Sequence, residues 1–118
     1  MFKESLQRIV DNVDGGLAGL LMGFDGIPVE SYTRDPATMD IQTVGMEFSY
    51  ILTQVRKAAE ALEIGNVQEI AIRAEKLSVI IRVLTPEYFL ALALSESGNF
   101  GKGRYLLRIT APKLQAEL

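Results

Sequence analysis

The hydrophobic pattern is most regular between Asp40 and Leu62, where apolar residues recur at helical spacing. On a helix these residues form one stripe about 140° wide, which is typical of a helix that lies against a sheet. The stripe consists of Ile41, Val44, Phe48, Ile51, Leu52, Val55, Ala58, Ala59 and Leu62. We therefore predict one long amphipathic helix, with Thr38 or Asp40 as its N-cap and Ile64-Gly65-Asn66 at its end.

The opposite face of this helix is polar except for Met46 and Tyr50, which lie one turn apart. Because Met adapts to varied surfaces and Tyr adds contact area with a polar tip, the pair indicates a surface that meets a partner. Thr53 and Lys57 continue the same surface. Between the two faces, Gly45-x-x-x-Ser49 forms an edge of small residues where a second backbone could approach closely.

A shorter helix and a hairpin come before the long helix. The first helix is predicted to end after Asp14, at Gly15-Gly16, and its helical spacing is carried by Phe2, Leu6, Ile9, Val10 and Val13. The runs Leu17–Phe24 and Ile27–Tyr32 flank Asp25-Gly26, which is a strong hairpin signal. Pro28 cannot donate a ladder hydrogen bond, so we expect the second strand at a sheet edge.

Three strands and a helix follow the long helix. Val67–Ala74 alternates between apolar and polar residues, whereas Leu77–Leu84 and Tyr88–Ser95 are nearly continuous apolar runs. Short polar connections between them predict an antiparallel meander. Residues 95–103 are expected to form a flexible loop, and Arg104–Leu118 a last helix that Pro112 kinks.

Continuous apolar strands need cover on both faces, so we expect the long helix on one face and the other two helices on the opposite face. Phe48, Leu52 and Val55 should then pack against the strands that contain Ile80, Ile81, Leu90 and Leu92. The predicted fold is one α/β (α+β) domain over residues 1–118, with a five-stranded, mostly antiparallel sheet and the element order α-β-β-α-β-β-β-α.

Composition narrows the function. The chain has no cysteine and no histidine, and its net charge is −3. Without these side chains we expect no catalytic residues, no metal site and no cofactor, and the absence of disulfides favours the cytoplasm. The negative charge argues against nucleic acid, and no apolar run reaches the roughly 20 residues of a membrane span. These features favour a binding protein over an enzyme.

The predicted strand Val67–Ala74 is half apolar, and nothing else in the chain covers its edge. Because an uncovered edge invites pairing with another chain, we predict a two-fold homodimer. The strand would contribute Val67, Glu69, Ala71 and Arg73. The long helix would contribute Gly45, Ser49 and Leu52.

Three segments resemble the roadblock family, the dynein-light-chain-related domains that also regulate small GTPases in bacteria and archaea. These are the strand and turn from Leu21 to Val29, the Ala-rich end of the long helix, and the segment Asn99–Arg108. The resemblance implies a sheet of order 2-1-5-4-3 and homodimers without chemistry of their own. It also implies that a Ras-like GTPase docks across the paired long helices, and that some members linked to motility and polarity stimulate GTP hydrolysis. On this chain the GTPase site is placed at Met46, Tyr50, Thr53 and Lys57.

Two other functions stay open. One is a structural adaptor or scaffold in a larger complex without a GTPase. The other is a small-ligand sensor of the profilin or PAS type, which would need a cavity lined by polar groups. The loop Gly98–Gly103 departs from the phosphate-loop pattern, because Gly103 follows Lys102 where Ser or Thr is required, and a flexible connector is the preferred interpretation.

Overall fold

The computed structural model describes residues 1–118 and has the predicted order of helices and strands. The five strands form one sheet in the order β2-β1-β5-β4-β3, and every neighbouring pair is antiparallel. The elements are α1 (Phe2–Asp11), β1 (Gly16–Gly23), β2 (Pro28–Thr33), α2 (Ile41–Leu62), β3 (Glu69–Arg73), β4 (Ser78–Val83), β5 (Tyr88–Leu94) and α3 (Phe100–Glu117). The predicted fold class and strand order are confirmed.

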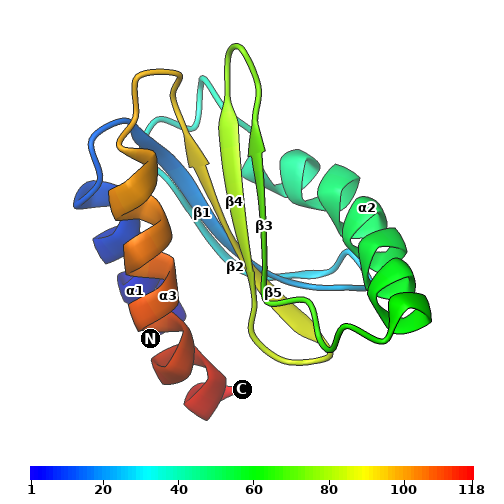
Figure 1. Ribbon diagram of the computed structural model, residues 1–118. Coiled ribbons are helices and arrows are strands. Elements are labelled where there is room, and N and C mark those ends of the chain that lie inside the picture. Colours follow the sequence, from blue (N-terminus) through cyan, green and yellow to red (C-terminus); the bar gives the residue numbers. More distant parts are fainter.

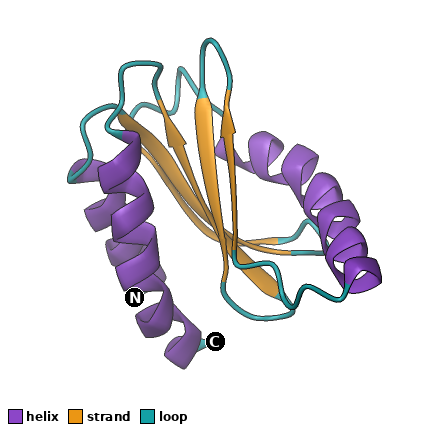
Figure 2. Ribbon diagram, in the orientation of Figure 1, coloured by secondary structure: helices purple, strands orange, loops and turns teal.

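The helices form separate layers on the two faces of the sheet. Figures 1 and 2 show α2 alone on one face, with α1 and α3 side by side on the other. Each face has its own buried cluster, because both sides of the central strands are apolar. None of the three helices combines the length and the apolar character needed to span a bilayer.

The structure corrects part of the predicted core. Leu52 and Ile81 belong to the cluster under α2, as predicted. Ile80, Leu90 and Leu92 belong instead to the cluster under α1 and α3. Side chains alternate between faces along a strand, and a continuous apolar run does not reveal which residues point to which face.

The ends of the long helix have clear local causes. Asp40 is the N-cap, and its Oδ1 accepts hydrogen bonds from the backbone N–H groups of Gln42 and Thr43, both at 3.2 Å. The hydrogen bonds from Thr43 and Gln42 lower the pKa of the Asp40 carboxyl below its ordinary value. The helix ends at Leu62, and the next residue, Glu63, is its C-cap in a left-handed conformation with a φ of 55°.

Several boundaries differ from the prediction. α1 ends at Asp11 instead of Asp14, and β3 is shorter than predicted and leaves Val67 outside the strand. The last helix begins at Phe100, because Asn99 caps it by accepting a hydrogen bond from the N–H of Lys102 at 3.1 Å. Gly103 lies within this helix and is buried, since a Cβ there would meet Leu92 Cδ2 at 2.9 Å. Of the predicted loop 95–103, only residues 95–99 lie outside the helix.

Candidate functional site

The inner face of α2 is built from small residues at its centre. A Cβ on Gly45 would lie 2.2 Å from Leu20 Cδ2 and 3.0 Å from Met22 Sδ, so α2 and β1 approach closely here. Ser49 is also buried, and its hydroxyl donates to the Met46 carbonyl at 2.8 Å. Gly45, Ser49 and Leu52 therefore form the contact of α2 with its own sheet, and their predicted role in a dimer interface stays a prediction.

Turning the small residues inward rotates part of the apolar stripe outward. Ile51 and Leu62 are 47% and 68% exposed, although both were predicted to face the sheet. We call this side of the helix the apolar flank; it comprises Val44, Phe48, Ile51, Val55 and Leu62. Val44, Phe48 and Val55 are half-buried, so the flank extends from the core to the surface.

The outward side of α2 carries the four residues predicted to bind a partner, here called the outer patch. Met46 and Tyr50 are 58% and 66% exposed, and Lys57 is exposed beside them. Thr53 is half-buried, and its hydroxyl donates to the Ser49 carbonyl at 3.1 Å. The structure therefore gives Met46, Tyr50 and Lys57 free side chains, whereas Thr53 forms the inner margin of the patch.

β3 is an edge strand with a free side. Ala71 is exposed, whereas Glu69 is paired with Arg104 at 2.7 Å and Arg73 lies over the Phe100 ring at 4.8 Å. These two charged side chains are therefore held against α3. What β3 leaves open is its backbone edge.

The other face of β3 is incompletely covered. Ile70 and Ile72 pair with Ile81 and Val79, so they point toward the α2 side of the sheet. They are only half-buried, since α2 packs mainly on β1 and β2. Incompletely covered apolar side chains thus lie beside the free backbone edge.

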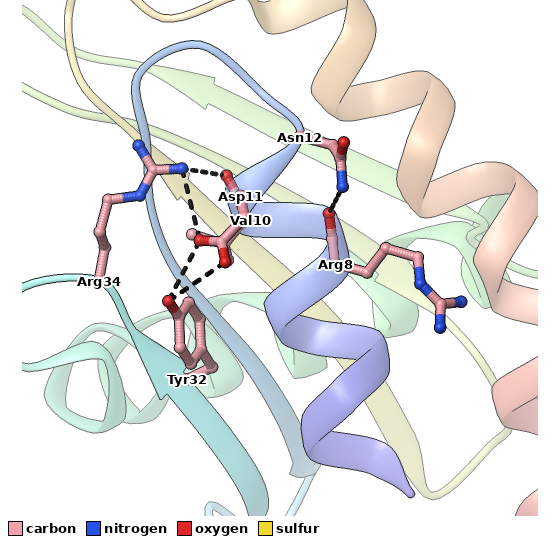
Figure 3. Close-up of polar contacts among 6 residues, drawn as sticks. All are labelled: Arg8, Val10, Asp11, Asn12, Tyr32 and Arg34. Carbon is pink, nitrogen blue, oxygen red and sulfur yellow. Dashed lines mark hydrogen bonds and ion pairs between the residues drawn. The ribbon is translucent and has the colours of Figure 1, made fainter.

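The opposite edge of the sheet is tied down. Asp11 accepts a hydrogen bond from the Tyr32 hydroxyl at 3.1 Å, and Arg34 donates to the Val10 carbonyl at 2.8 Å (Figure 3). Desolvation, together with the nearby Asp11 carboxylate, raises the pKa of Tyr32. These contacts join β2 and the residue that follows it to the end of α1. Sequence reasoning missed this cluster, because its members are far apart in the chain.

Arg56 is engaged within the molecule. Its guanidinium lies 4.0 Å from the Phe24 ring centroid and donates to the Pro86 carbonyl at 3.0 Å. Beside it, a surface concavity of about 680 Å³ lies between the end of α2, the connection to β3 and the β4–β5 turn, and both polar and apolar residues line it. Every buried side-chain polar atom has a hydrogen-bond partner, and no group of side chains is arranged to hold a metal. The molecule therefore offers surfaces for contact with a partner, and this concavity is open to solvent rather than an enclosed ligand cavity.

Comparison with known proteins decides the family. The chain is 46% identical to MglC from Myxococcus xanthus over 98% of its length and 97% of that chain, with a TM-score of 0.70. The Roadblock/LC7 domain from Streptomyces avermitilis matches with a TM-score of 0.85 and 13% identity, over 98% of this chain and 95% of that chain. The chain belongs to the roadblock/LC7 family.

Two MglB structures share the roadblock fold. The gliding protein MglB from Thermus thermophilus has a TM-score of 0.84 and 16% identity, and an MglB with a tetrameric arrangement has 0.85 and 17%. Each match covers 96% of this roadblock chain and 84% of the MglB chain. No protein-family model and no curated protein matches the sequence.

Proposed function

We propose that this roadblock chain is a regulator without catalytic activity of its own, and that its homodimer binds a Ras-like small GTPase. The observation that carries the proposal is the outer patch, where Met46 and Tyr50 stand exposed on an otherwise polar helix face. Exposed Met and Tyr are typical of contact surfaces, and family membership adds the kind of partner. We place this function in the cytoplasm, in signalling that controls polarity or motility, by likeness to a gliding protein.

The dimer is proposed to form through the edge of β3 and the apolar flank. Pairing of two β3 edges satisfies their free backbone groups and continues the sheet through both subunits. The flank and the half-buried Ile70 and Ile72 then supply apolar area, which a stable interface needs at about 800 Å² per subunit. The tetrameric arrangement of a related MglB supports self-association in this fold.

The GTPase is proposed to lie across the two outer patches of the dimer. Met46 and Tyr50 would be the central anchors, and Lys57 would pair with a carboxylate at the rim. Because Arg56 is engaged with Phe24 and Pro86, it is not proposed as a group that enters the GTPase active site. Any stimulation of hydrolysis would then come from ordering residues of the GTPase itself.

Regulation requires that the dimer distinguish two states of the GTPase, since equal affinity for both would shift no equilibrium. The test is a calorimetric titration of the dimer with a Ras-like GTPase loaded with GDP or with a non-hydrolysable GTP analogue. Met46→Asp and Tyr50→Ala should weaken binding about 5- to 100-fold, which is the range for a central anchor.

The matched control is Tyr105→Ala, since Tyr105 is 51% exposed on α3, on the other face of the sheet. This variant should bind like the wild type. Equal losses from Tyr50→Ala and Tyr105→Ala would contradict the outer patch as the site. If neither nucleotide state binds, the chain is a structural adaptor and the GTPase proposal is wrong.

A further inference from the structure

A second surface lies on the other side of the sheet, between α1 and α3. There the two helices leave a groove of about 500 Å³. Its apolar residues are Ile9, Leu106 and Ile109, of which Ile9 is buried, Leu106 is half-buried and Ile109 is 51% exposed. The three side chains thus form an apolar floor that continues from the core to the surface at Ile109.

The groove is rimmed by positive charge. Arg8, Lys102 and Lys113 line it, and no Asp or Glu does, although acidic residues outnumber basic ones by 15 to 12 in the chain. None of the three cations takes part in an ion pair. Figure 3 shows Arg8 pointing away from the Asp11–Tyr32–Arg34 contacts on the other side of α1. The charge of the rim is therefore available to a ligand.

The spacing along α3 defines the shape of this ligand. Lys102, Leu106, Ile109 and Lys113 follow one another at helical intervals, with apolar residues in the middle and a cation at each end. At 1.5 Å per residue this stripe is about 16 Å long, or three helical turns. Arg8 adds a cation from the α1 side.

We propose that this groove binds an acidic amphipathic helix of a partner protein. The apolar side chains of that helix would fill the floor, as in other helix-in-groove complexes, and carboxylates near its two ends would face the rim. Nucleic acid fits less well, because the floor is apolar and three cations are few for a phosphate backbone. The groove and α2 lie on opposite faces of the sheet, so both surfaces can be occupied at once.

The test uses the full chain and a fluorescein-labelled helical peptide of about 16 residues, with Leu at its centre and Glu near both ends. Its matched form carries Gln in place of every Glu. Fluorescence anisotropy should show that the Glu peptide binds at least about tenfold more tightly than the Gln peptide, and that added salt narrows this difference. Amide shifts in NMR should appear at Ile9, Leu106 and Ile109.

The variant Lys102→Glu/Lys113→Glu should weaken binding of the Glu peptide at least about tenfold. The matched control, Lys3→Glu/Lys76→Glu, changes the net charge equally but lies outside the groove, and it should bind like the wild type. Ile109→Asp should also weaken binding, because it puts a carboxylate into the floor.

Three results would overturn the proposal. Equal losses in the two double variants would mean general charge attraction. NMR amide shifts confined to α2, or the absence of binding at about 1 mM peptide, would mean that the groove does not bind the peptide helix. A change in the mass of the unliganded protein on Ile109→Asp would make the groove a contact between copies of this chain.

Discussion

Gly45 determines how α2 lies on the sheet. A helix-interior glycine is unfavourable by about 1 kcal/mol relative to alanine, so its presence needs a compensating contact. The contact is the close approach to Leu20 and Met22 of β1, both of which are fully buried and have little room to move. One missing side chain therefore decides which side of the apolar stripe turns inward.

We expect Gly45→Ala to lower the free energy of unfolding. Overpacking a filled core costs about 1–3 kcal/mol, and at a 2.2 Å approach we expect it to exceed the helical gain of about 1 kcal/mol. The control is Gly101→Ala in α3, where the nearest atom to an added Cβ, Asn99 Oδ1, is 3.9 Å away. There the substitution should stabilise by up to about 1 kcal/mol. Urea denaturation measures the change in the free energy of unfolding for both variants, and the two changes should have opposite signs. If both substitutions stabilise the protein, α2 does not approach β1 closely at Gly45.

Asp40 links the stability of α2 to pH. Its pKa is lowered in the folded protein from an ordinary value of 3.8, so its carboxylate stabilises the fold above that pH. The contribution is lost as pH falls through the lower, folded pKa. Asp40→Ala should therefore reduce the Tm at pH 7, and the difference from wild type should shrink in acid below about pH 3.8.

Asp14→Ala is the control for this effect, since the Asp14 side chain is exposed and makes no hydrogen bond or ion pair. It should leave the Tm nearly unchanged at both pH values. A difference between wild type and Asp40→Ala that is constant with pH would mean that the carboxylate is not the stabilising group.

At the scale of the element, periodicity predicts that α2 exists and is amphipathic, but not how it is rotated. The rotation depends on Leu20 and Met22, which are remote in sequence from the helix. For the same reason the facing of Ile80 and Leu90 could not be predicted, because their neighbours in β4 and β5 are equally apolar. The start of α3 was missed since Gly101 and Gly103 lower helix propensity, while the fit of Gly103 over Leu92 appears only in three dimensions.

Two neighbouring residues test the rotation of α2. Leu52 is 1% exposed and Ile51 is 47% exposed. Leu52→Ala should cost about 2–5 kcal/mol of stability, whereas Ile51→Ala should cost the monomer well under 1 kcal/mol. Thermal unfolding at low protein concentration, where any dimer dissociates, measures both. Similar losses would mean that the helix has been placed with the wrong side inward.

At the scale of the molecule, the sequence predicts the layers, because apolar strands need cover on both faces, and the family resemblance adds the strand order. The sequence alone does not predict the surfaces that meet a partner, since these depend on which apolar residues the fold leaves uncovered. Ile51 and Leu62 are such residues on one face and Ile109 on the other. The fold thus presents two apolar surfaces with different surroundings.

Ile51→Asp should separate the proposed dimer into monomers, because it buries an unpaired carboxylate in the interface. Ile109→Asp makes the same change at a site that is 51% exposed on α3, and it should leave the dimer intact. Analytical ultracentrifugation of the two variants distinguishes these outcomes. A dimer that survives Ile51→Asp would exclude the apolar flank from the interface.

The mass of the complex with a GTPase tests the central claim most directly. A two-fold dimer presents two outer patches, and one GTPase that straddles both would exclude a second. Light scattering on the eluted complex should therefore give twice the chain mass of 13.0 kDa plus the mass of one GTPase. A larger fraction of the dimer should be in this complex in one nucleotide state than in the other. Tyr50→Ala should elute as the free dimer. A complex with one chain for each GTPase, or a dimer whose mass is unchanged in both nucleotide states, would contradict the account.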